Sequence, residues 1–286
     1  MRPDAATVER LVRVALDEDA PWGDVTSAAL IEKDAPLTAH LVAREAGVLC
    51  GEDLFAAAMR LTGAVRTEFA FHDGERFAEG AVLATAEGPA RAVLQAERVA
   101  LNFVQRLSGI ATLTARYVAE TAGTKARIVD TRKTTPGLRV VERYAVRCGG
   151  GGNHRFSLSD ALLAKDNHLA LLTRGGAEGL TEGLRAAFAR LPHTVHKEVE
   201  VDRLDQIEAV LAAGVDTVML DNFSMEDMRT GVRQIAGRAL VEASGGVRLE
   251  RIREIAATGV DIISVGALTH SVRALDLGLD VETTAL

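Results

Sequence analysis

The fold is decided by four short apolar runs, KEVEV (197–201), TVMLD (217–221), LVEAS (240–244) and IISVG (262–266), and by two earlier ones, ARIVDT (126–131) and ALLAKD (161–166). Most of them are separated by segments with helical spacing, at 174–190, 203–213, 225–236 and 248–258. Strands that alternate with helices in this way predict βα units and a parallel sheet. Continuous apolar runs are typical of parallel strands that are buried on both faces.

Each of these runs ends in polar, charged or glycine residues. The ends are Asp130-Thr131-Arg132-Lys133, Lys165-Asp166-Asn167-His168, Glu200, Asp221-Asn222, Ser244-Gly245-Gly246 and Gly266-Ala267. In a βα-barrel the carboxyl ends of all strands meet on one face, and that face carries the chemistry. We therefore expect one polar ring around one barrel mouth. A doubly wound open sheet is the alternative, but no G-x-G-x-x-G follows a strand, which disfavours its dinucleotide-binding form.

The first part of the chain has a different pattern. Residues 5–16 and 90–122 carry apolar side chains at helical spacing, and residues 37–45 and 81–85 alternate like half-buried strands. Ser108-Gly109 is expected to break or bend the second helix. We predict an α+β domain over 1–111 and an α/β domain over 112–286, whose C-terminal tail can pack back onto the first domain.

Composition narrows the class of protein. The chain has 286 residues, 48% of them hydrophobic and 26% charged, with a net charge of −7. This excludes disorder of the whole chain and argues against a nucleic-acid partner, which would need a basic face. The N-terminus lacks the apolar core of a signal peptide, and no apolar run approaches a membrane span. The two cysteines, Cys50 and Cys148, have no metal-ligand spacing, so we expect a cytoplasmic protein without disulfides.

The acidic average conceals one basic segment. Residues 127–155 hold seven Arg or Lys and two acidic residues, a local charge of +5 that leaves −12 for the rest of the chain. Arginine binds carboxylate and phosphate bidentately, so this excess suits a polyanionic small molecule. Arg139, Arg143 and Arg147 share one face of a predicted helix, and we interpret Arg143 and Arg147 as solvated. The roles of Arg139, Arg143, Arg147 and His270 stay open.

The motifs in order resemble the quinolinate phosphoribosyltransferase family, also called nicotinate-nucleotide pyrophosphorylase (carboxylating). The most specific are TRKTTPG (131–137) and GGGGNHR (149–155), supported by LLAKDNH (162–168), EVEV (198–201), LDN (220–222), SGG (244–246) and VGALTHS (265–271). LDEDAPWGDVTS (16–27) and LQAERVALNFVQRLSGIAT (94–112) extend the resemblance to nearly the whole chain. Two departures, Ala164 and Ala243, remove no polar group.

The resemblance implies an N-terminal α+β sandwich, a C-terminal incomplete α/β barrel, and at least a homodimer. It implies a pentosyltransferase that transfers phosphoribosyl from phosphoribosyl pyrophosphate to quinolinate with decarboxylation. The products are nicotinate mononucleotide, pyrophosphate and CO₂, in de novo NAD biosynthesis. Mg²⁺ would accompany phosphoribosyl pyrophosphate, and no tightly bound organic cofactor is expected.

Site roles follow from the same resemblance. Arg132, Lys133, Arg155 and Arg98 would hold the quinolinate carboxylates, with Arg98 donated by the neighbouring subunit and with Thr131 and His154 lining the pocket. Lys165 would bind carboxylate or pyrophosphate. Glu200 and Asp221, on adjacent strands, would hold Mg²⁺ or the ribose hydroxyls, directly or through the substrate. Two loops, Ser244-Gly245-Gly246 and Val265-Gly266-Ala267, would bind the 5′-phosphate. Lys133, Lys165, Glu200 and Asp221 are the predicted catalytic residues.

Several alternatives stay open at this point. Lys165 can instead form a structural ion pair with Asp166 or Glu200, and the two carboxylates can pair with Lys165 or Lys197. The chain can act on a related pyridine acid such as nicotinate, which has one carboxylate and needs fewer cations. A ligand-binding protein without catalytic activity on the same fold is a further alternative.

Overall fold

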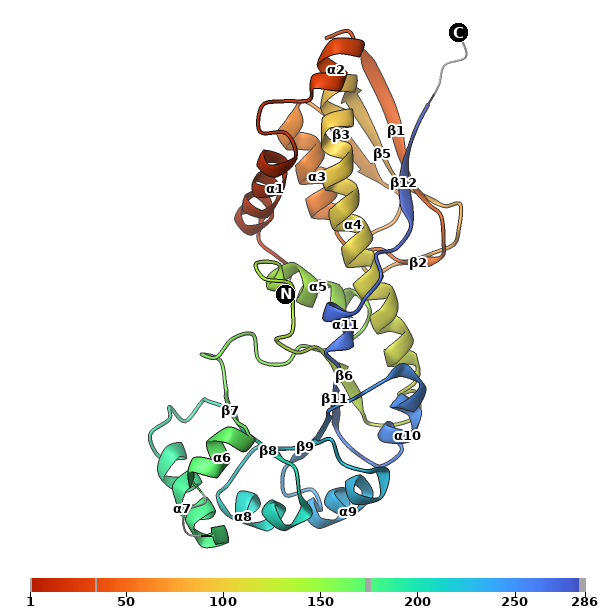
Figure 1. Cartoon of the computed structure of the whole chain (residues 1–286). Coiled ribbons are helices and arrows are strands. Elements are labelled where there is room, and N and C mark those ends of the chain that lie inside the picture. Colours follow the sequence, from red (N-terminus) through yellow and green to blue (C-terminus); the bar gives the residue numbers. More distant parts are fainter. Residues whose placement is uncertain (1, 34, 173–175, 283–286) are drawn as a thin grey trace. The chain divides into compact units, whose positions relative to one another are not determined.

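The computed structural model describes residues 2–33, 35–172 and 176–282, which form two compact units (Figure 1). The first unit comprises Met1–Ala115, Thr134–Gly150 and Leu268–Leu286, and the second comprises Arg116–Lys133 and Gly151–Ala267. The units are therefore not continuous in sequence. The chain leaves the second unit after Lys133 and re-enters it at Gly151.

A parallel sheet forms the centre of the second unit. Its strands are β6 (Arg127–Val129), β7 (Leu162–Ala164), β8 (Lys197–Val201), β9 (Thr217–Asp221), β10 (Leu240–Ser244) and β11 (Ile262–Ser264), in the spatial order β6-β11-β10-β9-β8-β7. All neighbours in this order are parallel. From β7 to β11 the order follows the sequence without the reversal of a doubly wound sheet, and β6 lies beside β11. Among the described residues β6 and β7 do not pair, so the barrel is incomplete.

Helices alternate with these strands and lie around their outer side (Figure 1). They are α6 (Asp166–Leu172), α7 (Gly176–Phe188), α8 (Ile207–Ala212), α9 (Met225–Ile235) and α10 (Ile252–Ala256), with 3₁₀ turns η1 (Leu204–Gln206) and η2 (Leu249–Arg251). The six predicted strands and the four predicted helical segments are confirmed, although residues 174 and 175 lie outside the described part of the chain.

The first unit is an α+β structure. Its main sheet has the order β12-β1-β5-β3, with antiparallel neighbours. These strands are β1 (Pro36–Ala43), β3 (Arg66–Phe69), β5 (Val82–Pro89) and β12 (Leu277–Val281), and β2 (Gly47–Val48) pairs separately with β4 (Arg76–Phe77). The helices are α1 (Ala5–Asp19), α2 (Val25–Leu30), α3 (Glu52–Thr62), α4 (Ala90–Ala119) and α5 (Arg139–Cys148), and α11 spans Ala267–His270. In β1, Ala39, Leu41 and Ala43 are buried, which confirms the predicted alternation.

The predicted break at Ser108-Gly109 is wrong, because α4 runs as one helix through both residues. Their presence has a packing reason. A Cβ at position 109 would lie 2.3 Å from the carbonyl oxygen of Arg273, so glycine allows the C-terminal segment to pack directly on the helix. Ser108 is fully buried, and its Oγ accepts the N–H of Cys50 at 3.0 Å.

The helix α5 also differs from expectation, because Arg143 is buried and not solvated. Glu142, fully buried on the same helix, accepts hydrogen bonds from Arg106 on α4 at 2.9 Å and from the hydroxyl of Thr135 at 2.7 Å. Residues 134–150 therefore pack into the first unit partly through the ion pair between Glu142 and Arg106.

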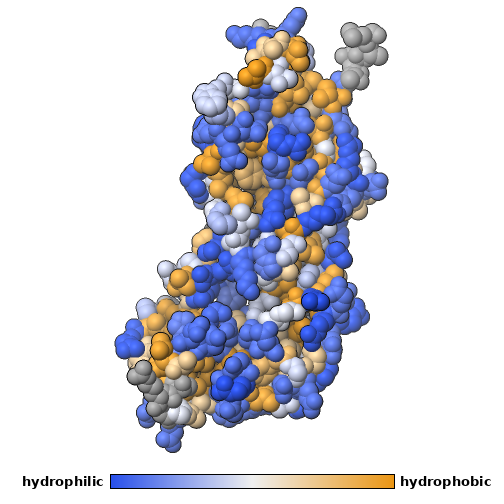
Figure 2. All heavy atoms as spheres, in the orientation of Figure 1, coloured by the Kyte–Doolittle hydropathy of each residue, from blue (hydrophilic) through white to orange (hydrophobic). Residues whose placement is uncertain are grey.

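The surface visible in Figure 2 is mainly hydrophilic, with scattered apolar side chains. The most exposed large apolar residue in the described part of the chain is Trp22, at 95%. Within the described residues, no helix has both the length and the apolar character that crossing a membrane requires.

Candidate active site

The site is built at the carboxyl ends of the strands of the second unit. Side chains two residues apart on a strand point to the same face, so Glu198 and Glu200 of β8 share a face, as do Glu242 and Ser244 of β10. In the sheet register Ser244 lies beside Asp221, and Glu242 lies beside Met219, which is also the neighbour of Glu200. The polar residues of three adjacent strands therefore share one face. Of the predicted site residues, all except Arg98 belong to this unit.

A basic group follows β6 and the glycine-rich loop. Arg132 and Lys133 come directly after the strand, and the Oγ1 of Thr131 accepts the N–H of Lys133 at 3.1 Å. Arg155 donates to the carbonyl oxygen of Ala161 at 3.0 Å. Burial and the neighbouring positive charge of Arg132 lower the pKa of Arg155. A bound anion would stabilise the charge of Arg155, which suits a ligand with several negative charges.

Asp130 fixes the loop that carries the second part of this group. It is fully buried at the end of β6. Its carboxylate accepts the side-chain amide of Asn153, and the N–H of His154 at 2.9 Å. The isolated bridge between Val129 and Gly152 adds backbone contact to the same loop. The buried carboxylate thus holds His154 and Arg155 beside the end of β6.

His154 lies between two buried carboxylates. Its Nε2 is 3.1 Å from Glu198 and 3.5 Å from Glu242, and its Nδ1 accepts the N–H of Arg155 at 2.8 Å. Burial alone would lower the pKa of His154, but the two carboxylates outweigh it and raise the pKa to about 10. Burial also raises the pKa of Glu198. The three groups have the spacing of metal ligands. The Nε2 of His154 faces both carboxylates, but one buried oxygen of each, Oε1 of Glu198 and Oε1 of Glu242, has no hydrogen-bond partner among the described residues. A charged imidazole carries a proton on each nitrogen. A proton on Nδ1 would break the hydrogen bond that the N–H of Arg155 donates to it, so charging the ring requires the backbone at residues 154–155 to move.

An acidic pocket lies at the ends of β8 and β9. It encloses about 270 Å³ and is lined by Asp166, Leu169, Glu200, Asp202, Gln206, Asp221 and Asn222. Lys165 donates to the Oε2 of Glu200 at 2.6 Å, which is one of the ion pairs left open by the sequence. The lysine side chain is 48% exposed. The side chain of Glu200 is only 11% exposed, so the anionic ligand would approach the pair from the exposed side of Lys165.

The loops after β9 and β10 are fastened together. Asn222 has a left-handed backbone conformation, with φ of 57°, and its N–H donates to the carbonyl of Ser244 at 3.0 Å. A Cβ at position 245 would lie 2.2 Å from the Oδ1 of Asn222, so glycine is required there. Gly245 and Gly246 both have positive φ. The resulting tight turn leaves backbone, not side chains, at the end of β10.

The remaining predicted residues are those of the 265–267 loop, Arg98 and His270. The N–H of Val265 donates to the carbonyl of Val129 at 2.9 Å, so this N–H serves the sheet and not a phosphate. Ala267 begins α11 and Gly266 precedes it. Arg98 is exposed on α4 in the first unit. His270 is exposed, and its Nδ1 lies 2.6 Å from the hydroxyl of Ser271.

Sequence reasoning assigned no role to Asp130, Asn153, Glu198 or Glu242. Their signal was present, because a charged residue inside a buried apolar run must be paired or functional. Glu198 and Glu242 each lie two positions before a predicted site residue on the same strand. Their common partner, His154, is distant in sequence, and only the folded chain shows the contact.

The fold and the site define a class: an α/β-barrel enzyme that binds an anionic small molecule beside a carboxylate-lined pocket. Comparisons with known proteins agree. The family model described as "Quinolinate phosphoribosyl transferase, C-terminal domain" matches residues 110–280, and that of the N-terminal domain matches residues 24–108. The chain belongs to this family.

Relatives resemble the chain over nearly its whole length. It is 44% identical to "Nicotinate-nucleotide pyrophosphorylase [carboxylating]" of Mycobacterium leprae, over 94% of this chain and 95% of that protein. It is 40% identical to a probable enzyme of the same name from Bacillus subtilis, over 92% and 90%. The solved structure of nicotinate-nucleotide pyrophosphorylase from Francisella tularensis superposes with a TM-score of 0.91 at 39% identity, covering 98% of both chains.

Proposed function

We propose that this chain transfers the phosphoribosyl group of phosphoribosyl pyrophosphate to quinolinate, with loss of CO₂, and so forms nicotinate mononucleotide and pyrophosphate for NAD biosynthesis. The observation that carries the proposal is the pairing of a basic group with an acidic pocket on one barrel, in a chain that belongs to this family throughout. The name of the relatives, nicotinate-nucleotide pyrophosphorylase (carboxylating), describes the same reaction in reverse.

The basic group accounts for the choice of pyridine acid. Quinolinate carries two adjacent carboxylates, and Arg132, Lys133 and Arg155 supply cationic groups from two neighbouring loops of the second unit. Arginine can grip a carboxylate through two parallel hydrogen bonds, which fixes the orientation of the ring as well as its position. His154 lines this region, with its ring held by Glu198 and Glu242.

The acidic pocket suits the ribose end of the second substrate. Glu200 and Asp221 offer hard oxygen ligands of the kind that Mg²⁺ prefers, or acceptors for ribose hydroxyls. We propose that they hold Mg²⁺ jointly with the substrate, whose phosphate oxygens would supply further ligands. When bound, Mg²⁺ would neutralise charge on the pyrophosphate. The turn at Ser244-Gly245-Gly246 and the backbone of Gly266-Ala267 are proposed to receive the 5′-phosphate, without the N–H of Val265, which is bonded to Val129.

The chain's own residues mainly position the reactants. Displacement of pyrophosphate at the anomeric carbon develops positive charge on the ribose, as in other glycosyl transfers. Glu200 and Asp221 would stabilise that charge, and Lys165, released from Glu200, would stabilise the departing pyrophosphate. Binding orients the pyridine nitrogen toward the anomeric carbon. Once the nitrogen is bonded to ribose and cationic, loss of the adjacent carboxylate as CO₂ becomes easier.

We extend the proposal to assembly and location. Arg98 is exposed on α4, as a residue that reaches a neighbouring subunit must be, and Trp22, Val25 and Leu30 form exposed apolar surface that a homodimer would cover. Both cysteines are free thiols, which is typical of a cytoplasmic protein.

The proposed function is tested by incubating the purified protein with quinolinate, phosphoribosyl pyrophosphate and Mg²⁺. We expect nicotinate mononucleotide and CO₂ to form in equal amounts, and no nucleotide to form when nicotinate replaces quinolinate. Turnover of nicotinate without CO₂ release would reassign the substrate. Binding of both substrates without turnover would indicate a ligand-binding protein.

A further inference from the structure

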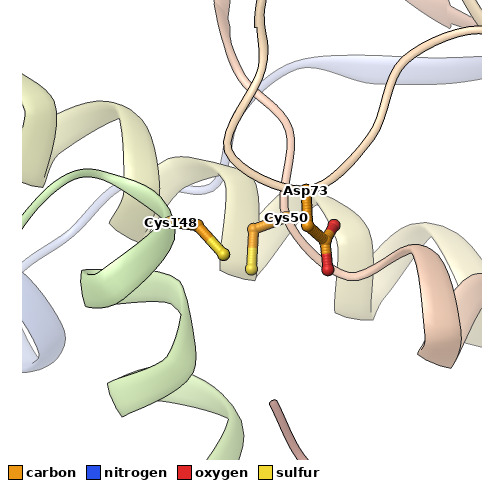
Figure 3. A group of neighbouring side chains, drawn as sticks. All are labelled: Cys50, Asp73 and Cys148. Atoms are coloured by element: carbon orange, nitrogen blue, oxygen red, sulfur yellow. The ribbon is translucent and has the colours of Figure 1, made fainter. Parts of the chain in front are cut away.

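Three metal-ligating side chains from separate segments converge in the first unit, outside the site described above (Figure 3). Cys50 follows β2, Asp73 precedes β4, and Cys148 is the last residue of α5. One ligand atom from each, two Sγ and one carboxylate oxygen, lie within 4.8 Å of one another. The spacing of the two cysteines in the sequence gave no indication of this contact.

The backbone at each corner is fixed. Cys50 is fully buried, its N–H donates to the Oγ of Ser108 at 3.0 Å, and that hydroxyl donates back to the carbonyl of Cys50 at 3.3 Å. Gly149, next to Cys148, packs where a Cβ would meet the carbonyl oxygen of Ala111 at 2.3 Å. A rigid frame of this kind holds the side chains together without a bound ligand.

Asp73 carries the strongest sign of a missing partner. Its Oδ1 accepts the N–H of Gly51 at 2.7 Å and of Glu52 at 3.1 Å, at the start of α3. Its Oδ2 is buried and has no well-aligned hydrogen-bond partner among the described residues, although the side chain of Tyr144 interacts with this carboxylate. A buried acceptor left unpaired costs about 1–3 kcal/mol. Such an atom beside two thiols calls for a ligand.

We propose that Cys50, Asp73 and Cys148 bind one thiophilic divalent cation, Zn²⁺, in a tetrahedral site. Two thiolates and a carboxylate are a donor set that zinc accepts. Zinc–sulfur bonds of about 2.3 Å place tetrahedral thiolates about 3.8 Å apart, a separation that lies inside the 4.8 Å within which the ligand atoms gather here. Water would complete the coordination. Binding releases two thiol protons to solvent, while the Oδ2 of Asp73 becomes a ligand.

A Cys50–Cys148 disulfide would explain the structure less well. It would use two of the three converging groups and leave the Oδ2 of Asp73 buried without a well-aligned partner. It would also need an external oxidant, whereas zinc binding needs only the loss of protons.

The surroundings predict how binding depends on pH. Burial raises the pKa of Cys50 and that of Asp73, whereas the hydrogen bond with Cys50 lowers the pKa of Cys148, so Cys148 is the thiol that gives up its proton more readily. The other titratable groups facing it are Tyr144 of α5 and Glu52 of α3, and Glu52 is itself paired with Arg2 and with His72. Because two protons leave, affinity should rise by up to about 100-fold per pH unit while both thiols are protonated.

The test is metal binding by the full-length, reduced protein, followed through bound zinc per chain and through the absorption of Co²⁺ as a spectroscopic substitute. We expect one equivalent of metal and a thiolate-to-cobalt charge-transfer band. In the Cys148→Ser variant, which keeps one thiol, the charge-transfer band should lose the intensity that two thiolate ligands give. Asp73→Asn keeps the Oδ1 acceptor and should weaken zinc by about 100-fold or more, since loss of an outer partner alone costs about 10–100-fold.

Asp53→Asn is the matched control, because Asp53 is an acidic residue of α3 that pairs with Arg2 and has no atom in the cluster. It should bind metal like the unaltered protein. The proposal fails if the reduced protein, with two titratable thiols, takes up no Co²⁺ or Zn²⁺. It also fails if the Asp73→Asn variant binds metal as tightly as the control. It fails likewise if Cys50 and Cys148 are recovered as a disulfide although the protein was prepared with a reductant. Turnover of quinolinate plays no part in these readouts.

Discussion

At the scale of single residues, the site depends on cations that are held in place by buried anions. Asp130 fixes the loop that carries Arg155, and Glu198 holds the ring of His154. In the proposed site, Arg155 would bind the substrate while its loop is fixed from behind by Asp130. This arrangement separates the residues that bind from the residues that position them.

Replacing a binding cation should therefore abolish activity without unfolding the protein. We expect Lys133→Ala and Arg155→Ala each to lower kcat/KM for quinolinate by about 100-fold or more, as loss of an electrostatic contact in a preorganised site does. Circular dichroism and thermal unfolding should match the unaltered protein. Near-normal kinetics in either variant would refute the assignment.

Replacing a positioning anion should have a different signature. Glu198→Gln should lower the pKa of His154 from about 10 toward the ordinary 6.5, which NMR titration of the ring measures. A raised native pKa stabilises the fold fully below the unfolded value and loses this effect as pH rises toward 10. The variant's loss of stability, about 1.5–3 kcal/mol, should thus be greatest below pH 6.5. Glu242→Gln, the more distant carboxylate, should shift the pKa less; an unchanged pKa in both would contradict the contact.

At the scale of elements, two glycines inside helices differ in the space that a side chain would find there. Gly109 in α4 faces the carbonyl of Arg273, where a Cβ would lie at 2.3 Å, whereas a Cβ at Gly179 in α7 would meet its nearest neighbour at 3.7 Å. Gly179→Ala should stabilise the protein by about 0.5–1 kcal/mol. Gly109→Ala should destabilise it by about 1–3 kcal/mol despite the better helix propensity. Urea unfolding measures both, and equal effects would show that the contact with Arg273 is unimportant.

The barrel strands and Gly109 show which features a sequence predicts and which it does not. The six barrel strands were predictable because burial on both faces leaves uninterrupted apolar runs such as Val218–Leu220. Gly109 misled, because local propensity marks a break where tertiary packing requires a small residue. Arg143, the cluster at Cys50 and the carboxylates around His154 were missed for a related reason. Their partners lie far away in sequence, and one sequence carries no record of such pairs.

At the scale of the whole molecule, the proposed dimer makes a specific prediction. If Arg98 serves the neighbouring site, Arg98→Ala and Lys133→Ala subunits should each be inactive alone but active when mixed. A hybrid dimer contains one site with Lys133 and the partner's Arg98 intact. In an equal mixture half of the dimers are hybrids, so about a quarter of normal activity should return. Failure to recover activity, with exchange verified by mass spectrometry, would place Arg98 in its own subunit's site or outside any site.

The pairing of β1 with β12 has a consequence for biosynthesis. Ala39 pairs with Val281, so β1 waits for a strand that is made about 240 residues later. At a synthesis rate of about 5–20 residues per second, the edge of β1 stays uncovered on the ribosome for roughly 12–50 s. During that time it is open to pairing with other chains. The nascent protein should therefore need protection by chaperones at its earliest segment, and ribosome-bound chains that stop before residue 277 should aggregate through β1.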